Sequence, residues 1–126
     1  LYTTRFYRLL ARALTAEGAV VVQATSPLLA RKSFWCVVET MEAAGWSARA
    51  YHATVPAFGE WGYVLAARKP FDVPQETVAN LKYLDGPTMR SMFVFPRDMS
   101  RVSAEVNRLD NQILVQYYEE EWSRWN

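Results

Sequence analysis

Residues 46–68, WSARAYHATVPAFGEWGYVLAAR, contain two β-strand patterns separated by a short loop. Residues 46–55 and residues 61–68 are rich in the aromatic, β-branched and small apolar residues that strands accept. Residues 56–60 include the proline and the glycine that turns favour. Because so short a loop can join only neighbouring strands, this stretch predicts an antiparallel pair.

The chain before this pair alternates helix and strand patterns. Apolar residues at helical spacing predict an amphipathic helix over residues 2–15, and residues 19–23, AVVVQ, predict a strand. We expect that strand to be buried on both faces, as in a parallel sheet. Ser26 and Pro27 predict the start of a second helix, with Ser26 as the N-cap, and Gly45 predicts its end. This order predicts an α/β fold similar to the second half of a Rossmann-like methyltransferase sheet, which ends in an antiparallel hairpin.

The second half of the chain is expected to be helical. Its apolar spacing predicts one helix over residues 72–84 and a last helix over residues 103–122. We expect the acidic run 119–121 to form a solvated end of that helix; the alternatives are a frayed end or pairing with another part of the protein. Prolines between these helices break the chain into short pieces. We therefore expect one domain in two parts, with the second half of the sheet in residues 1–70 and a helical C-terminal extension in residues 71–126.

Composition excludes several classes of protein. The 126 residues suffice for one compact domain, and 51% of them are hydrophobic, which argues against disorder. The formal net charge of +1 does not indicate a nucleic-acid partner. No apolar run approaches the roughly 20 residues that a membrane span requires, and no signal-peptide pattern begins the chain.

The only cysteine, Cys36, lies in an apolar run and is expected to be a buried structural thiol. A single thiol cannot form an internal disulfide, so a reducing compartment such as the cytoplasm fits the sequence. His52 is the only histidine. One cysteine and one histidine without further ligand spacing do not predict a metal site.

Several segments of the sequence resemble those of the polyamine aminopropyltransferases, the spermidine synthase family. Residues 51–66, YHATVPAFGEWGYVLA, are similar to the late strand-loop-strand of that family, and residues 22–26 resemble its glutamine-bearing strand end. Residues 81–83 and 93–96 fall where the family has similar segments. The ending, residues 106–122, is similar to the bacterial branch whose catalytic domain follows a membrane-embedded region. The resemblance covers nearly the whole chain.

The resemblance implies the transfer of an aminopropyl group from decarboxylated S-adenosylmethionine to a diamine such as putrescine. It also implies that the glycine-rich loop, the ribose-binding acid and the catalytic aspartate loop lie before Leu1. We therefore expect no catalytic residue and no bound cofactor in this chain, and no activity from the chain alone. The implied location is the cytoplasm, at the inner face of a bacterial membrane.

The same resemblance implies four diamine-binding residues. Gln23 ends a strand, where its amide oxygen can accept from an ammonium group; the alternative is a buried glutamine bonded to backbone. Phe58 stands where the soluble enzymes have a tyrosine, and would keep an aromatic wall without the hydroxyl. Glu60 would anchor a cation or be merely solvated, and His52 would line the site or meet a structural partner. Gly59 replaces a proline that is common in the soluble enzymes.

Two other classes of function stay open. A non-catalytic oligomerisation or docking module would suit the aromatic tail, which contains Tyr117, Tyr118, Trp122 and Trp125. A methyltransferase relative would keep the scaffold and change the substrate, although Gln23 and residues 55–62 favour the aminopropyltransferase. A half-sheet also exposes a strand edge and an apolar face, so we expect a homo-oligomer.

Overall fold

A computed structural model describes residues 1–125, which form four helices and three strands. In chain order these are α1 (Thr4–Ala13), β1 (Ala19–Gln23), α2 (Arg31–Ala43), β2 (Ser47–Val55), β3 (Gly59–Ala67), α3 (Gly86–Met92) and α4 (Ile113–Ser123).

The three strands form one sheet in the order β1-β3-β2. The central strand β3 is antiparallel to both neighbours, with Tyr63 opposite Gln23 of β1 and opposite Tyr51 of β2. The β2–β3 hairpin confirms the antiparallel pair expected from residues 46–68. Since β1 and β2 therefore run in the same direction, α2 connects them as a crossover helix, and the predicted α/β fold is confirmed.

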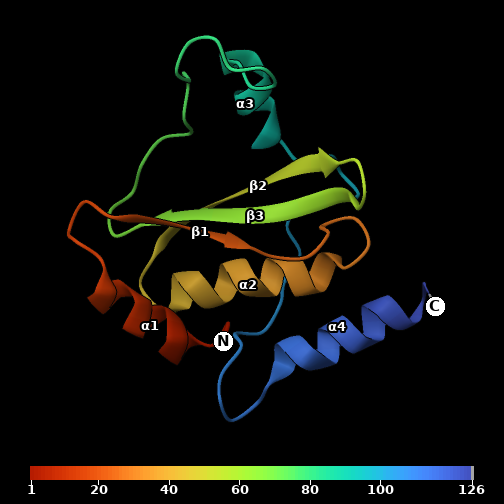
Figure 1. Ribbon diagram of the computed structural model, residues 1–126. Coiled ribbons are helices and arrows are strands. Elements are labelled where there is room, and N and C mark those ends of the chain that lie inside the picture. The colour runs from red at the N-terminus through yellow and green to blue at the C-terminus, as the bar shows by residue number, and fades with distance from the viewer. Residues whose placement is uncertain (126) are drawn as a thin grey trace.

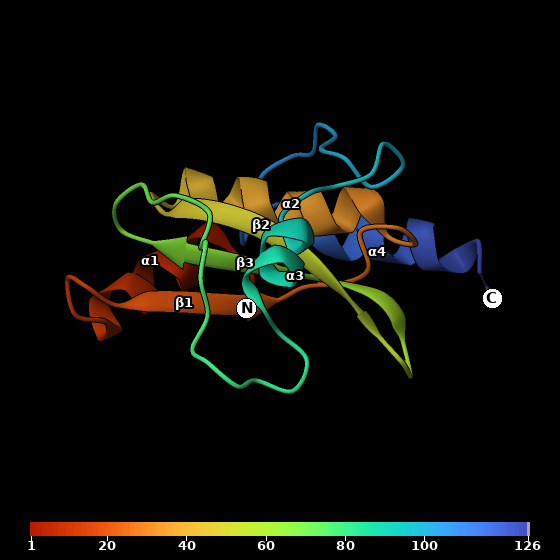
Figure 2. The ribbon, with the colours of Figure 1, turned by 90° about the horizontal axis from the view of Figure 1, so that it is seen from above.

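The helices lie mainly on one side of this sheet. In Figure 1 the sheet lies above α2, α1 and α4 lie below it, and α3 lies above the sheet. The view from above in Figure 2 shows α2 running along the sheet and α4 continuing beyond it toward the C-terminus. Within residues 1–125, the opposite side of the sheet therefore has helical cover only where α3 meets β2.

The hydrophobic core lies between the sheet and α2. Phe34, Val37, Val38 and Met41 lie on the apolar face of α2 and are all buried. Gly62 of β3 permits a close approach to α2: a Cβ atom at this position would lie 2.2 Å from Cε1 of Phe34. The strand can pack this closely on the helix only because Gly62 has no side chain.

The expectation that β1 is buried on both faces is wrong. The side chain of Val21 is 57% exposed, whereas its neighbours Val20 and Val22 pack against the core. The burial pattern alternates because helices cover only one face of β1. Within residues 1–125, β1 is also an edge strand, with a hydrogen-bonded neighbour on one side.

The expected start of α2 is also wrong. Ser26 Oγ accepts hydrogen bonds from the backbone N–H groups of Leu28 at 3.3 Å and Leu29 at 3.2 Å. These bonds stabilise a turn, and α2 begins only at Arg31. Its N-cap residue is Ala30, whose methyl group cannot accept a hydrogen bond.

The helix expected over residues 72–84 does not form. That segment is irregular, and the helix α3 begins after it. Asp85 is its N-cap and accepts from Thr88 N–H at 2.8 Å, and Pro87 lies in the first turn. Pro87 therefore helps to begin a helix, because a proline in the first turn removes no helical hydrogen bond.

The last helix is shorter than expected, because α4 starts at Ile113 and residues 103–108 are not helical. Asn107 N–H donates to Thr40 Oγ1 of α2 at 2.9 Å, and Asn107 itself is 3% exposed. This segment makes hydrogen bonds to α2 in place of helical ones, since Cys36 Sγ also donates to the carbonyl oxygen of Glu105.

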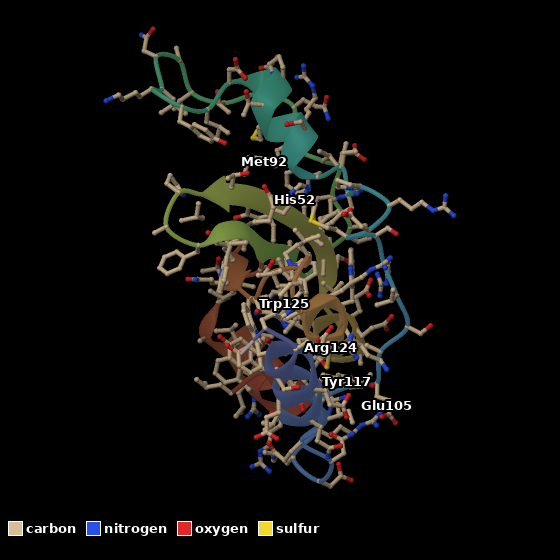
Figure 3. All side chains as sticks on the ribbon, turned by 90° about the vertical axis from the view of Figure 1, so that its right-hand side faces the viewer. His52, Met92, Glu105, Tyr117, Arg124 and Trp125 are labelled. Atoms are coloured by element: carbon tan, nitrogen blue, oxygen red, sulfur yellow. The ribbon has the colours of Figure 1, made fainter. Side chains whose placement is uncertain are left out.

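The chain after α3 crosses the outer edge of β2. The ring of Phe93 lies 5.2 Å from that of Tyr51, and the ring of Phe95 lies 5.1 Å from that of Trp35 on α2. Figure 3 shows Met92, the last residue of α3, beside His52 of β2. Residues 93–95 therefore carry the chain from one face of the sheet to the other.

No helix within residues 1–125 combines the length and the apolar character that a membrane crossing requires. The expected division of the domain near residue 70 stays a prediction.

Candidate functional site

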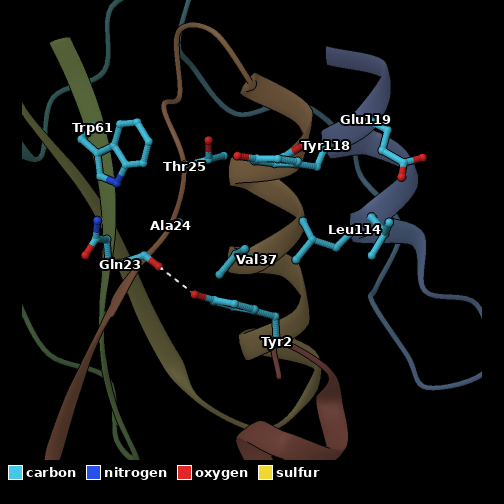
Figure 4. Close-up of a pocket in the computed structure, with 11 residues that line it drawn as sticks. Tyr2, Gln23, Ala24, Thr25, Val37, Trp61, Leu114, Tyr118 and Glu119 are labelled. Carbon is cyan, nitrogen blue, oxygen red and sulfur yellow. Dashed lines mark hydrogen bonds between the residues drawn. The ribbon is translucent and has the colours of Figure 1, made fainter. Parts of the chain in front are cut away.

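An open cleft of about 790 Å³ lies where β1 ends. Its volume is in the range of small-molecule sites. Figure 4 shows β1 running into it, with α2 and α4 on the opposite side. The lining residues come from both ends of the chain and from the sheet: Tyr2, Gln23, Ala24, Thr25, Ser33, Val37, Trp61, Leu114, Val115, Tyr118 and Glu119.

One side of the cleft is apolar and aromatic. In Figure 4 the rings of Tyr2 and Tyr118 lie on either side of Val37, and Leu114 lies beside them. Aromatic faces attract cations and alkyl chains pack against them, so this wall suits an aliphatic amine. Glu119 adds a negative charge to the same lining.

Gln23 lies on the other side of the cleft. Its side chain is exposed, and it shares a sheet face with Trp61 and Tyr63, which is the face turned away from α2. Its backbone carbonyl accepts a long hydrogen bond of 3.5 Å from Tyr2 Oη, drawn in Figure 4. The exposed amide differs from the buried glutamine of the alternative interpretation and can meet a ligand at the end of the strand.

Two buried polar atoms in this lining have no hydrogen-bond partner within residues 1–125. They are Thr25 Oγ1 and Trp61 Nε1, and Thr25 is 8% exposed. A buried polar group without a partner costs roughly 1–3 kcal/mol. Such atoms in a native site indicate a place where a ligand or a water molecule completes the bonding.

His52 and Glu60 form a separate cluster on the opposite face of the sheet. His52 Nδ1 lies 2.7 Å from Glu60 Oε2, and Thr54 Oγ1 donates to Glu60 Oε1. His52 Nε2 lies 2.7 Å from the carbonyl oxygen of Val94, which can only accept, so Nε2 is the donor there. Partial burial raises the pKa of Glu60, but the hydrogen bonds from Thr54 and His52 outweigh it and hold this pKa below its ordinary value of 4.5.

Phe58 lies in the turn between β2 and β3 and is 66% exposed. Its ring lies 5.8 Å from that of Trp61, which connects the turn to the Gln23 side of the cleft. The next residue, Gly59, has a φ of +77°. A proline ring holds φ near −65°, so this turn differs in backbone from one that carries proline at the same place.

The structure thus divides the four expected diamine-binding residues into two groups. Gln23 lines the cleft and Phe58 reaches it through Trp61, whereas His52 and Glu60 bind one another on the other face. The register explains this division, because His52 and Glu60 share the face of Gly62, which packs on α2. Their roles toward a substrate stay predictions.

Sequence reasoning missed several cleft residues. One of them is Trp61, which is half-buried and lies at the cleft. Trp61 lies two residues before Tyr63 in the same strand, so the two side chains share the sheet face of Gln23. This alternation is a sequence signal from which the place of Trp61 could have been predicted. Tyr2 and Tyr118 are far apart in sequence, and no local pattern connects them with β1.

The remaining reactive side chains give no sign of a further centre. Cys36 is buried, as expected, and burial raises the pKa of its thiol to about 11. Among residues 1–125 no three His, Cys, Asp or Glu side chains are grouped so as to hold a metal ion.

The fold is that of an α/β chain of the Rossmann-like methyltransferase type, and an open cleft lies at the carboxyl end of one of its strands. The model of the spermine/spermidine synthase domain matches residues 1–77. The chain therefore belongs to the spermine/spermidine synthase family.

Relatives and solved structures agree with this assignment. The chain is 45% identical over 124 residues to the polyamine aminopropyltransferase of Leptospira interrogans. The aligned region covers 98% of this chain and 25% of that relative. It is 49% identical over 124 residues to polyamine aminopropyltransferase 2 of Ralstonia nicotianae, with 97% of this chain and 24% of the relative covered. The crystal structure of spermidine synthase from Thermotoga maritima superposes with a TM-score of 0.64 at 21% identity, over 76% of this chain and 36% of that one.

A spermidine synthase in complex with the transition state analogue AdoDATO gives the same TM-score of 0.64, at 21% identity, over 76% of this chain and 37% of that one. The chain spans about a quarter of the length of the curated relatives it matches.

Proposed function

We propose that this chain is the acceptor-side portion of an aminopropyltransferase, in which an aminopropyl group passes from decarboxylated S-adenosylmethionine to a diamine such as putrescine. The observation that carries the proposal is the exposed amide of Gln23 at a cleft beside the end of β1, in a chain of the spermine/spermidine synthase family. The curated relatives, named polyamine aminopropyltransferases, are about four times as long, so the adenosyl site and the catalytic base belong to the rest of such an enzyme.

The reaction sets requirements that the cleft meets in part. The diamine carries positive charge, so its site needs oxygen acceptors and aromatic faces, which Gln23, Tyr2 and Tyr118 supply. The attacking nitrogen must also lose a proton to a carboxylate and lie in line with the carbon next to the sulfonium. Gln23 binds and orients the amine. Phe58 and Trp61 form the wall of the site next to the β2–β3 hairpin.

The test is the substitution Gln23→Leu in the full-length protein that contains this chain. The change keeps the side-chain volume but turns an apolar group toward an ammonium. A hydrogen bond to a charged group is worth about 1.5–3 kcal/mol, so kcat/KM for the diamine should fall about tenfold or more. The KM for the sulfonium donor should change little, because its adenosyl contacts lie elsewhere.

Gln75→Leu is the matched control, because Gln75 is also exposed and lies far from the cleft in the irregular segment before α3. If Gln23→Leu lowers the melting temperature but leaves the diamine kinetics unchanged, Gln23 does not belong to the site. A full-length protein that transfers no aminopropyl group at all would refute the proposed function.

Further features of the whole protein are proposed with it. The single cysteine and the substrates of the family favour a cytoplasmic enzyme, and the similarity of residues 106–122 to the membrane-linked branch favours attachment at the inner face of a bacterial membrane. For the chain by itself, the open edge of β1 and the exposed Val21 favour further strand pairing, and we propose a homo-oligomer. No resident cofactor beyond the sulfonium co-substrate is proposed.

A further inference from the structure

The first turn of α2 has no cap of its own. Ala30 precedes it, and its first turn contains no acidic residue that could balance the helix dipole. The cap comes instead from Glu121, near the end of α4. Its carboxylate accepts from Lys32 N–H at 2.8 Å, from Ser33 N–H at 2.7 Å and from Ser33 Oγ at 2.7 Å.

Tyr117, one turn before Glu121, is fixed on the same side of α4. The side chain of Tyr117 is 7% exposed, and its hydroxyl accepts from the backbone N–H of Glu105 at 3.2 Å. Lys32 Nζ lies 4.8 Å from the centre of the Tyr117 ring. Figure 3 shows Glu105 beside Tyr117. These contacts hold α4 at one position and one rotation against α2.

The neighbouring face of α4 forms a wall of the cleft. Leu114 and Tyr118 lie one turn apart on that face and both line the cleft opposite Gln23. Because consecutive residues of a helix are separated by about 100° of rotation, fixing Tyr117 and Glu121 also fixes Leu114 and Tyr118. The width of the cleft therefore depends on how α4 is docked.

We propose that Glu121 is a positioning residue for the amine acceptor: by capping α2 it places the Leu114–Tyr118 wall of α4 and so sets the length of the diamine that the cleft accepts. The proposal rests on the proposed function, since it assumes that the cleft binds the diamine. Glu121 does not touch the substrate; it acts through Tyr118. A helix that is released from this cap can move outward, which gives room for an additional methylene group.

The experiment uses the full-length protein that contains this chain, with butane-1,4-diamine and pentane-1,5-diamine in competition for limiting decarboxylated S-adenosylmethionine. Mass spectrometry of the two products gives the ratio of the two kcat/KM values, which does not depend on how much of the enzyme is folded. Glu121→Ala should shift this ratio toward the five-carbon diamine by about threefold or more, because one methylene group is typically worth about tenfold or more in a defined pocket. Glu120→Ala, an exposed neighbour with the same loss of charge, should leave the ratio nearly unchanged.

If Glu121→Ala fails to fold, Glu121→Gln replaces it, since its amide oxygen can still accept from Ser33 but without charge. It should shift the ratio in the same direction and by less. An unchanged ratio in the folded variant, with an active wild-type protein, would overturn the positioning role alone. A wild-type protein that forms neither product would overturn the proposed function, and this inference with it.

Discussion

Replacing Gly62 with alanine should destabilise the protein severely, because β3 touches α2 at this position. The added Cβ would lie 2.2 Å from Cε1 and 2.4 Å from Cδ1 of Phe34, and 2.8 Å from the carbonyl oxygen of Thr25. Phe34 is fully buried and cannot turn aside. The strand cannot withdraw easily either, because Gly62 N–H donates to Thr25 O at 3.0 Å and Gly62 O accepts from Ala24 N–H at 2.9 Å.

The magnitude follows from these contacts. Forcing an additional methyl group into a packed core costs about 1–3 kcal/mol, and each backbone hydrogen bond that is stretched costs up to about 1 kcal/mol more. We expect the free energy of unfolding to fall by about 3 kcal/mol, which lowers Tm by roughly 10 °C in a domain of this size. Thermal and urea unfolding followed by circular dichroism measures both quantities.

A double-mutant cycle with Phe34→Leu isolates the clash. Gly62→Ala should cost less in the Phe34→Leu background than in the wild type, because the smaller side chain leaves space for the methyl group. Gly59→Ala is the matched control: nothing lies within 4 Å of its added Cβ, and its φ of +77° costs about 1–2 kcal/mol that Phe34→Leu should not relieve. A loss below 1 kcal/mol in Gly62→Ala, or additive effects in the cycle, would refute the packing argument.

Two further predictions concern titrating groups. The pKa of Glu60 is lowered in the folded protein, so its contribution to stability is present above its ordinary pKa of 4.5 and is lost as the pH falls through the lower, folded value. Glu60→Gln should therefore flatten the dependence of the unfolding free energy on pH in the acid range. The control Glu76→Gln, which changes an exposed carboxylate in the irregular segment before α3, should leave this dependence unchanged. Equal pH curves for the wild type and Glu60→Gln would contradict the prediction. Burial raises the pKa of Cys36 to about 11, so iodoacetamide at pH 8 should alkylate this thiol far more slowly in the native protein than in urea, and equal rates would show that the thiol is accessible.

The parts of the fold that the sequence predicts well depend on local patterns. The β2–β3 hairpin follows from two strand patterns and a short turn, and the buried face of α2 follows from apolar residues at helical spacing. The position of Gln23 at the end of β1 also follows from a local pattern, because residues 19–23 predict that strand, whereas the exposure of its side chain does not. In these elements the neighbours that determine the structure are close in sequence.

The second half of the chain could not be predicted from such patterns. Val106 and Leu109 lie at helical spacing with Ile113, yet the chain bonds to Thr40 of α2 and residues 103–108 are not helical. The exposure of Val21 depends on which face of β1 the helices cover. Both outcomes depend on partners that lie far away along the chain.

The candidate site divides in the same way. Local patterns predict an α/β sheet with a hairpin and a strand that ends at Gln23. The ion pair of His52 and Glu60 on the opposite face, and the capping by Glu121 of a helix 88 residues earlier, depend on how distant segments pack. An orphan N–H group or a partly buried carboxylate bonds to whichever partner the completed packing brings within hydrogen-bond distance, and no local pattern specifies that partner.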